Sequence, residues 1–362
     1  GAILKQWQQR HPELVTVLTK ENGGQGSARN LGMAHARGQW ITMPDPDDIL
    51  EPDYFAVVDN FLKANEATVM VATNRIYLQD GTGKLSDTHP LRAHFKGGDR
   101  LIDIDSFPDF FHGSAPAAFF RSDILDSSGV LFDDRVQPNF EDGHFCCRYL
   151  LGCPSSLVGF VQSARYIYRR RSDGSSTLQN SLRDPRRFLS VPRFGYLDAL
   201  KRGAEARSGK PPAWLQNFML YEISFYFSSD LAFSRPSAAH GKVGAEFVEI
   251  LREIVQLLDP DVIRGFRVRT IDRVWRDILL HALREDNWCT DYAVVQRYDP
   301  SRKAIRVAYR YSGRQPEETI LVDGKPFNVI DGKIKDHQYF GETLLFERDI
   351  WVPLKRSLQI LV

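Results

Sequence analysis

The stretch QWITMPDPDD, residues 39–48, joins a short apolar run to a cluster of acidic side chains. The run 39–43 predicts a short buried strand, which ends at the Pro-Asp-Pro sequence that follows. Three carboxylates within four residues, Asp45, Asp47 and Asp48, repel one another unless a cation lies between them. Ligands bind where the strands of an open α/β sheet end, and carboxylate oxygens suit Mg²⁺ or Mn²⁺. The spacing suits an acidic helix cap equally well, so both interpretations stay open.

The sequence on both sides of this stretch alternates between two periods over residues 1 to about 180. Helical patterns alternate with β-branched or apolar runs that are typical of strands. The predicted helices cover residues 2–11, 27–36 and 54–64, and the strand-like runs cover residues 15–18, 39–43 and 69–78. Such alternation predicts an α/β layer architecture with a largely parallel sheet.

Residues beyond 180 follow two other patterns. Apolar side chains recur at helical spacing through residues 247–258 and 271–282, which predicts buried helix faces. After residue 291 the pattern becomes strand-like, with hairpin-type dipeptides at Asp323-Gly324 and Asp331-Gly332. We therefore predict three domains: an α/β domain over 1–183, a helical domain over 184–290 and a small antiparallel β module over 291–362.

The composition of the 362 residues excludes several classes of protein. The chain has 47 basic and 46 acidic residues, a formal net charge of +1, whereas a dedicated nucleic-acid binder carries a strong basic excess. With 43% hydrophobic and 26% charged residues it can bury a core, which argues against intrinsic disorder. No run approaches the ~18 uninterrupted apolar residues of a membrane-spanning helix. The sequence therefore predicts a globular protein of two or three domains.

A glycine-rich stretch, ENGGQGSARN at residues 21–30, runs into the second predicted helix. Glycines let the backbone approach a ligand closely, and a helix N-terminus favours negative charge. Arg29 in the first helical turn would add a guanidinium for a phosphate. Such a stretch is more often a structural turn before a helix, so taken alone it leaves both roles open.

A further acidic pair occurs in the stretch FEDGHF at residues 140–145. Glu141 and Asp142 enter an amphipathic helix, where acidic side chains commonly do no more than stabilise the helix dipole. A carboxylate held within hydrogen-bond reach of a substrate hydroxyl would instead act as a general base. The residue types alone do not decide between these two roles.

Taken in order, these three stretches resemble family 2 glycosyltransferases of the GT-A fold. The resemblance covers residues 1 to about 180 and implies a Rossmann-like nucleotide-diphospho-sugar transferase domain. The motifs that carry it are NxGxGSARNxG at 22–32, DxDD at 45–48, FFR at 119–121, ED at 141–142, YxYRR at 166–170 and the serine pair 175–176.

The resemblance also implies a role for each matching residue in an inverting transfer without a covalent intermediate. Asp142 would be the general base that deprotonates the acceptor hydroxyl, and Glu141 would support it or contact the acceptor. Asp47 would contact a divalent Mn²⁺ or Mg²⁺ on the donor diphosphate. The donor site would include Asn22, Gly24, Arg29, Asn30, Asp45 and Asp48, and the acceptor or phosphate site would include Arg169, Arg170, Ser175 and Ser176. For the basic stretch 169–171, a merely solvated cluster is the alternative.

The sequence departs from the family at two points. In the family, a strand, a nucleotide-contacting loop and a second strand precede the segment matched here, and nothing corresponding stands before Ala2. By that pattern the GT-A domain is N-terminally truncated, and we expect residues 1–362 alone to show little or no activity. Pro46 stands in the acidic motif where the family commonly has a small polar residue.

The layout beyond residue 183 resembles bacterial enzymes that build or decorate wall teichoic acid and capsular polymers. That resemblance implies hexosyl or N-acetylhexosaminyl transfer from a nucleotide-diphosphate sugar, a UDP-sugar first of all, to a glycan or polyol-phosphate acceptor. It implies a cytoplasmic protein with peripheral association at the inner face of the membrane. A homo-oligomer stays open, because exposed strand edges could pair. The alternatives are an inactive fragment that binds polymer or serves as an oligomerisation scaffold, and a nucleotidyltransferase that releases pyrophosphate.

Overall fold

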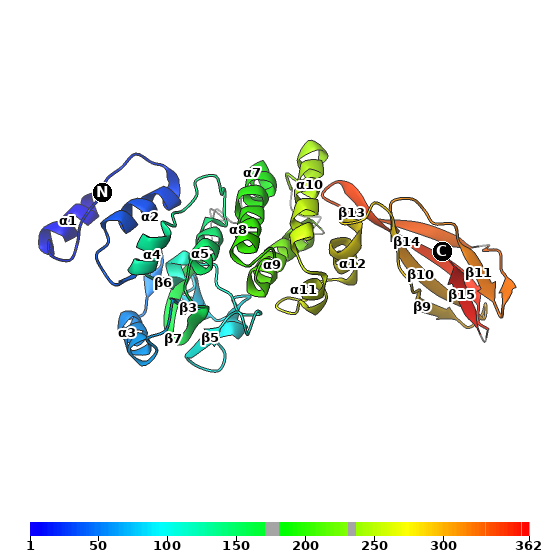
Figure 1. Ribbon diagram of the computed structural model, residues 1–362, viewed down its shortest axis with the longest axis horizontal. Helices are drawn as coiled ribbons and strands as arrows, with labels where there is room; N and C mark the ends of the chain where they lie inside the picture. Colours follow the sequence, from blue (N-terminus) through cyan, green and yellow to red (C-terminus); the bar gives the residue numbers. More distant parts are fainter. Residues whose placement is uncertain (171–180, 231–236, 330, 356, 362) are drawn as a thin grey trace. The chain divides into compact units, whose positions relative to one another are not determined.

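The structure of the protein is a computed structural model that describes residues 1–170, 181–230, 237–329, 331–355 and 357–361. The chain forms two compact units, Gly1–Asn180 and Ser181–Val362 (Figure 1). The helical segment and the β module that we predict as separate domains both fall in the second unit. Compactness alone does not show that a segment folds independently, so the boundaries at 183 and 290 remain predictions.

The first unit is built on one sheet of seven strands with helices around it. Its helices are α1 (Ala2–Arg10), α2 (Gly24–His35), α3 (Tyr54–Ala64), α4 (Ser122–Ser128) and α5 (Glu141–Leu151), with 3₁₀ turns η1 (Arg92–Phe95) and η2 (Ala115–Ala117). Its strands are β1 (Trp40–Ile41), β2 (Ile49–Leu50), β3 (Met70–Gln79), β4 (Lys84–Ser86), β5 (Arg100–Asp103), β6 (Ala118–Arg121) and β7 (Leu157–Arg170).

The sheet of the first unit is mixed, so the prediction of a largely parallel sheet is wrong. Its strands lie in the order β1-β6-β3-β7-β2, with β4 beside β3 and β5 beside β7. Among the described strands only the central pair, β3 and β7, runs parallel. Alternating helices and strands indicate which elements form, but the direction of neighbouring strands depends on the connections between them.

Helix α3, predicted over residues 54–64, covers the sheet through one apolar face. Tyr54, Val58 and Phe61 recur at helical spacing and are buried against β3, β6 and β7. The Tyr54 hydroxyl also shares a hydrogen bond of 2.8 Å with the Thr73 hydroxyl of β3. Gly159 on β7 leaves room for the Phe61 ring, because a Cβ there would lie 2.4 Å from Phe61 Cε1. A side chain at residue 159 would therefore push α3 away from the sheet.

Two predicted elements before the acidic motif differ from those observed. Helix α2 begins at Gly24 rather than at residue 27, because the glycine-rich stretch itself enters the first helical turn. The run 15–18 forms no strand, although its residues are partly β-branched. It has no neighbouring strand in the described part of the chain, and β-propensity without a pairing partner does not make a strand.

The second unit combines a helical part with two antiparallel sheets, as predicted for its fold class. Its helices are α7 (Pro185–Ser190), α8 (Asp198–Ala206), α9 (Ala213–Asp230), α10 (Gly241–Leu257), α11 (Pro260–Gly265) and α12 (Arg273–Asp277), with η3 (Ser181–Arg183) and the π-helical turns η4 (Val191–Leu197) and η5 (Ile278–Ala282). Its strands are β8 (Trp288–Cys289), β9 (Val294–Asp299), β10 (Ala304–Ser312), β11 (Thr319–Val322), β12 (Lys325–Pro326), β13 (Gly332–Tyr339), β14 (Glu342–Pro353) and β15 (Leu358–Leu361). The apolar faces predicted over 247–258 and 271–282 are buried.

One of the two predicted hairpin turns of the second unit is confirmed. One sheet has the strand order β13-β14-β10-β8 with β9 beside β10, and the other has the order β12-β11-β15. Asp323-Gly324 turns β11 into β12 with φ of +49° and +76°, the conformation expected of this dipeptide. Asp331-Gly332 is not a hairpin turn, because β12 before it and β13 after it belong to different sheets. The turn between β13 and β14 is Phe340-Gly341, with φ of +58° and +79°.

Phe340 takes this unusual backbone conformation because its ring is a buried anchor. It is 0% exposed and contacts the rings of Phe227 and Phe247, with centroids 5.3 Å and 4.8 Å away. Its amide donates to Asp230 Oδ2 at 2.9 Å. Gly244 on α10 admits the turn, because a Cβ there would lie 1.9 Å from the Phe340 carbonyl oxygen. The hairpin tip thus packs onto α9 and α10.

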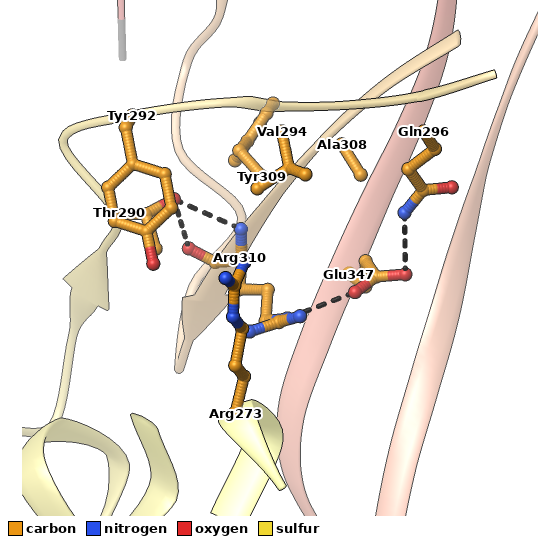
Figure 2. Close-up of a pocket in the computed structure, with 9 residues that line it drawn as sticks. All are labelled: Arg273, Thr290, Tyr292, Val294, Gln296, Ala308, Tyr309, Arg310 and Glu347. Atoms are coloured by element: carbon orange, nitrogen blue, oxygen red, sulfur yellow. Dashed lines mark hydrogen bonds and ion pairs between the residues drawn. The ribbon is translucent and has the colours of Figure 1, made fainter. Parts of the chain in front are cut away.

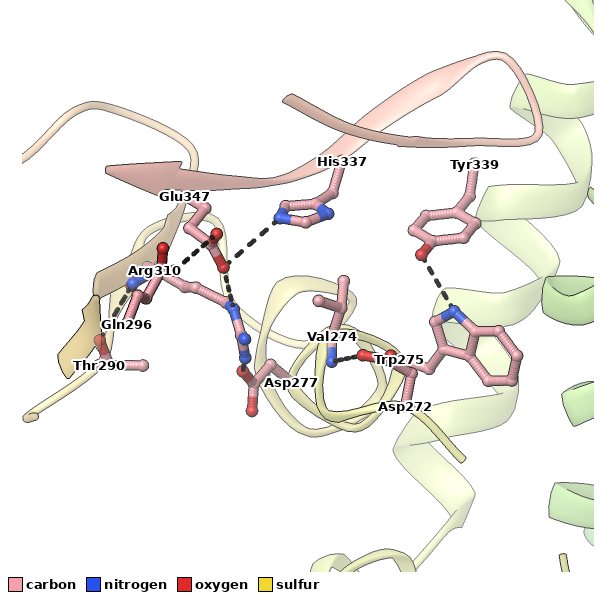
Figure 3. Close-up of polar contacts among 10 residues, drawn as sticks. All are labelled: Asp272, Val274, Trp275, Asp277, Thr290, Gln296, Arg310, His337, Tyr339 and Glu347. Atoms are coloured by element: carbon pink, nitrogen blue, oxygen red, sulfur yellow. Dashed lines mark hydrogen bonds and ion pairs between the residues drawn. The ribbon is translucent and has the colours of Figure 1, made fainter. Parts of the chain in front are cut away.

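Arg310 on β10 stands at the centre of an ion network that joins the sheet to α12 (Figure 3). Its Nη1 lies 2.6 Å from Asp277 Oδ2, and its Nε lies 3.0 Å from Glu347 Oε2. Gln296 donates to Glu347 Oε1 at 3.2 Å, and His337 Nε2 lies 3.8 Å from Glu347 Oε2. His337 and then Arg310 lower the pKa of Glu347 to about 2, against the opposing effect of burial. Glu347 therefore remains ionised in the folded state.

Glu347→Gln is expected to destabilise the second unit by on the order of 3 kcal/mol, the free energy equivalent of this pKa shift. Because folding lowers the pKa, the contribution is present above the ordinary Glu pKa and is lost as the pH falls toward 2. Urea unfolding at pH 7 and pH 3 should show the difference from wild type shrinking at the lower pH.

The control for this measurement is Glu317→Gln. Glu317 is exposed and has no ion pair in the described part of the chain, so its substitution should cost less than about 0.5 kcal/mol. Equal destabilisation by both substitutions would contradict the role of the Arg310 network.

Candidate active site

The acidic motif forms a tight turn between β1 and β2. The Asp48 amide donates to the Asp45 carbonyl oxygen at 3.2 Å. Pro46 occupies the second position of this turn, where the fixed φ of proline is favourable. The turn therefore accommodates the residue at which the sequence departs from the family pattern.

Strand β7 fixes this turn through Tyr166 and Arg169. The Tyr166 hydroxyl accepts from the Asp45 amide at 3.0 Å and donates to Asp48 Oδ2 at 2.7 Å. The Arg169 amide donates to Asp48 Oδ1 at 2.9 Å. Burial raises the pKa of Asp48, while these two donors oppose the shift. Both Asp48 oxygens accept hydrogen bonds from the protein, so this carboxylate supports the turn.

Arg29 on α2 joins the acidic turn to the start of α5. Its Nη2 lies 2.6 Å from Asp45 Oδ1, and its Nη1 lies 2.5 Å from Asp142 Oδ1. The Arg29 side chain is 9% exposed, and its guanidinium lies 5.3 Å from the centre of the Phe132 ring. Burial acts to lower the pKa of Arg29, but Asp142 and Asp45 raise it above its ordinary value. The guanidinium predicted to meet a donor phosphate is thus paired with two of the predicted site carboxylates.

The predicted catalytic pair occupies the first turn of α5. Phe140 precedes this helix with φ +73°, a left-handed conformation that is rare for a bulky residue. Its ring folds over Gly143, where a Cβ would lie 2.4 Å from Phe140 Cε2. The helix that follows brings Asp142 to Arg29 and Glu141 to Gln25, both on α2. Gly143 therefore leaves room for the Phe140 ring and so permits the left-handed backbone conformation of Phe140.

Asp142 has the electrostatic environment of a proton acceptor. Burial raises its pKa, Arg29 opposes this shift, and the carboxylates of Glu141 and Asp45 add to it. A carboxylate with a raised pKa takes up a proton more readily near neutral pH. The Asp142 side chain keeps 23% of its surface exposed, so a hydroxyl can reach it.

The other residues predicted to bind the donor make hydrogen bonds within the protein or shape its backbone. Asn22 Oδ1 accepts from the Gly24 amide at 3.1 Å, and Gly24 has φ +83°, so both shape the start of α2. The Asn30 side chain donates to the Phe132 carbonyl at 3.0 Å and accepts from its amide at 2.9 Å. Asn30 thereby holds the segment whose ring lies against Arg29. Donor binding by these residues stays a prediction.

The residues predicted to bind acceptor or phosphate are only partly described. Arg169 Nη2 lies 3.2 Å from Asp80 Oδ1, and the Arg170 guanidinium lies 3.5 Å from the centre of the Tyr77 ring. Ser175 and Ser176 lie outside the described residues. Their assignment to an acceptor or phosphate site stays a prediction.

Sequence reasoning missed the roles of Tyr166 and Phe132. Tyr166 belongs to a matched motif, but its contact with Asp48 joins residues 118 positions apart. Phe132 stacks on Phe145 of α5 at a centroid distance of 4.2 Å and lies under Arg29. No local pattern indicated these contacts, because the polar group that each residue meets is distant in the sequence.

The carboxylates of the acidic turn fit a divalent cation only in part. No group of three or more His, Cys, Asp or Glu side chains is placed to hold a metal within the described residues. Mg²⁺ commonly binds through one or two carboxylates plus phosphate oxygens of the substrate. Asp47 is half-buried on the turn beside Asp45, and such a donor set suits a cation that arrives with a diphosphate.

None of the described helices combines the length and apolar character needed to cross a membrane. The cytoplasmic location and the association with the inner face of the membrane remain predictions.

Comparison with known proteins gives a family match and similar proteins of teichoic acid biosynthesis. Residues 1–129 match the model described as glycosyl transferase family 2. The chain is 27% identical over 265 residues to the minor teichoic acid biosynthesis protein GgaB of Bacillus subtilis (strain 168), and 24% identical over 286 residues to GgaA of the same strain. These alignments cover 72% and 78% of this chain but 28% and 61% of the relatives. The chain thus spans less than two thirds of the length of either.

Solved structures confirm the predicted α/β GT-A fold. The chain is similar to the crystal structures of S. aureus TarS 1-349 alone and in complex with UDP, with TM-scores of 0.52 and 0.50. The sequence identity is 13% in both cases, and the alignments cover 76% and 72% of this chain and 72% and 69% of TarS 1-349. At this identity the similarity concerns the fold alone.

Tyr166→Phe is expected to lower the free energy of unfolding by about 1–2 kcal/mol, because the Asp45 amide and the Asp48 carboxylate each lose a partner. Tyr168→Phe is the matched control on the same strand, because no hydrogen bond of its hydroxyl is found in the described part of the chain. Thermal unfolding should show a clear loss only for Tyr166→Phe, and equal losses would contradict the structural role of its hydroxyl.

Proposed function

Residues 1–129 match the model of glycosyl transferase family 2, and from that match we propose a sugar transfer to a hydroxyl of a cell-wall or capsular polymer. The observation that carries the proposal is the pairing of Arg29 with both Asp45 and Asp142. It brings the predicted donor carboxylate and the predicted general base to one guanidinium. The donor is a nucleotide-diphosphate sugar, and the transfer inverts the anomeric carbon.

The chemistry of the transfer follows from the position of Asp142. Its carboxylate takes the proton of the acceptor hydroxyl while the oxygen attacks the anomeric carbon. The new glycosidic bond forms as the bond to the diphosphate breaks, and the electron pair leaves with the nucleoside diphosphate. Because the acceptor oxygen itself displaces the nucleoside diphosphate in one step, no covalent sugar–protein intermediate is needed.

Asp47 would hold Mn²⁺ or Mg²⁺ together with the donor diphosphate, and Asp45 beside it on the turn would contact the donor. Such a cation neutralises the charge that develops on the departing diphosphate. The hard carboxylate oxygens of the turn support this assignment.

The donor and acceptor classes rest on the relatives. TarS has been crystallised with UDP, and GgaA and GgaB are named as teichoic acid biosynthesis proteins. We therefore propose a UDP-hexose or UDP-N-acetylhexosamine donor and a glycan or polyol-phosphate acceptor. We also propose that the transfer takes place at the cytoplasmic face of the membrane.

Asp142→Asn is expected to lower kcat by about 10²–10⁴-fold, because an amide cannot accept the proton. The donor KM should change little. Release of nucleoside diphosphate with Mn²⁺ measures kcat for the wild type and the variant. Asp126→Asn, an exposed carboxylate on α4, is the control and should leave kcat unchanged.

Three results would contradict the proposal. One is an Asp142→Asn variant that keeps kcat within tenfold of wild type. Release of pyrophosphate would instead indicate a nucleotidyltransferase. Polymer binding without turnover by the wild-type protein would indicate the inactive scaffold.

The pH dependence of kcat/KM gives a separate prediction. Activity should rise with pH through an apparent pKa above that of an ordinary Asp, because Asp142 must be ionised to act. Arg29→Gln should move this acid limb to higher pH, because the cation that favours the carboxylate is removed. An acid limb that stays in place or moves to lower pH would contradict the role given to the Arg29–Asp142 pair.

A further inference from the structure

A small recess in the second unit, lined by α12 and strands β9, β10 and β14, lies outside the candidate active site (Figure 2). It encloses about 50 Å³. Arg310 is paired there with Asp277 and Glu347. With the guanidinium of Arg273 added, the charges around the recess balance. A neutral hollow of this size is accounted for by the packing of the Arg310 network.

In the first unit, strand β7 carries three extra residues beside the middle of β3. Thr73 of β3 pairs with Val161, but the next residue, Asn74, pairs with Arg165. Residues 162–164 therefore form a bulge that faces no residue of β3 in the described part of the chain. Bulges are rare in parallel pairs of strands and frequent beside active sites, where they redirect a side chain.

The odd number of extra residues changes the face of the sheet to which the following side chains of β7 point. Side chains of a regular strand alternate between the two faces. Val161 before the bulge and both Ala164 and Tyr166 after it nevertheless pack in the same core cluster against α3. In a regular strand with Val161 on this face, Tyr166 would point to the opposite face.

The face that Tyr166 reaches in this way is the one that meets the acidic turn. Its hydroxyl accepts from the Asp45 amide at 3.0 Å and donates to Asp48 Oδ2 at 2.7 Å. At the bulge the other edge of β7 also changes its partner, from β5 at residues 157–160 to β2 at residues 166–167. Because β2 follows directly on the acidic turn, the bulge determines how β7 meets this turn.

The loop before β5 holds the bulge in place through Asp99. Its Oδ1 accepts from the Ser163 amide at 2.9 Å, and its Oδ2 accepts from the Ser163 hydroxyl at 2.5 Å. The Gly98 amide donates to Gln162 Oε1 at 2.8 Å. Gly97 and Gly98 have φ of +102° and +87°, which lets the loop turn back onto the strand. The amide that the bulge leaves without a partner on β3 is thus satisfied by Asp99.

We propose that Asp99 is a positioning residue for donor binding. It fixes the bulge, the bulge turns Tyr166 toward the acidic turn, and the turn presents Asp45 and Asp47 to the donor. The last of these steps rests on the proposed function. Within the described part of the chain the Asp99 carboxylate bonds only to Ser163, so it acts on the site through strand β7.

Hydrogen–deuterium exchange tests this positioning without the need for turnover. The amides of the turn are protected by hydrogen bonds to the Tyr166 hydroxyl and the Asp45 carbonyl. Asp99→Ala should speed exchange in peptides that cover residues 43–50 by at least about fivefold, because the contacts of Tyr166 loosen. A purely local role of Asp99 would change exchange only in β5 and in the bulge.

Calorimetric titration with UDP in the presence of Mn²⁺ gives a second readout. Asp99→Ala and Tyr166→Phe should each weaken the binding of UDP by about fivefold. In the Tyr166→Phe background, Asp99→Ala should weaken it by less than about twofold more, because both substitutions act through the same contact.

Two further variants serve as controls. Asp99→Asn is the conservative variant, because the amide oxygen accepts from the Ser163 amide and the NH₂ group donates to the Ser163 hydroxyl. It should keep both exchange and affinity within about twofold of wild type. Asp87→Ala should leave both unchanged, since Asp87 is exposed and has no hydrogen bond or ion pair among the described residues.

Four results would overturn the positioning role. They are unchanged exchange in the turn of Asp99→Ala, an unchanged affinity of this variant for UDP, effects that multiply in the double variant, and equal effects of Asp99→Asn and Asp99→Ala.

The two proposals fail separately. Sugar transfer that depends on Asp142, with exchange in the turn unaffected by Asp99→Ala, would refute the positioning role and leave the proposed function standing. Faster exchange in the turn of Asp99→Ala, in a protein that transfers no sugar, would refute the proposed function and leave Asp99 as the residue that positions the acidic turn.

Discussion

The candidate active site depends on one buried guanidinium that is shared by two carboxylates. Arg29 is 9% exposed and pairs with Asp45 from the acidic turn and Asp142 from the first turn of α5. A buried charge that loses its partner is strongly destabilising, so each of the three groups requires the others. The remaining contacts serve the same arrangement: Tyr166 holds the turn, and Phe132 supports the guanidinium.

The residues of this site were predictable from the sequence, but their contacts were not. The order of the glycine-rich, acidic and Glu-Asp motifs identified Arg29, Asp45 and Asp142, and the structure brings these three together. The sequence led us to expect a phosphate beside Arg29. In the structure Arg29 pairs with Asp45 and Asp142, and a motif does not show which carboxylates fold onto such a side chain. Tyr166 meets Asp48 across 118 residues, a contact that no local pattern indicates.

The fold shows the same division between local and tertiary information. Helix α3 has the predicted ends, and the Asp323-Gly324 turn is where it was predicted, because helical period and this dipeptide are local signals. The hairpin at Phe340-Gly341 was missed, because burial of the Phe340 ring among Phe227 and Phe247 outweighs the cost of its left-handed backbone. The direction of the strands beside β3 and β7 likewise depends on tertiary pairing.

A double-mutant cycle on Arg29 and Asp142 tests the central claim most directly. The free energy of unfolding is measured for the wild type, Arg29→Gln, Asp142→Asn and the double variant. The account predicts a coupling energy of about 1–3 kcal/mol, because either single substitution leaves the other group buried with a lost partner. Additive effects, with a coupling below about 0.5 kcal/mol, would contradict it.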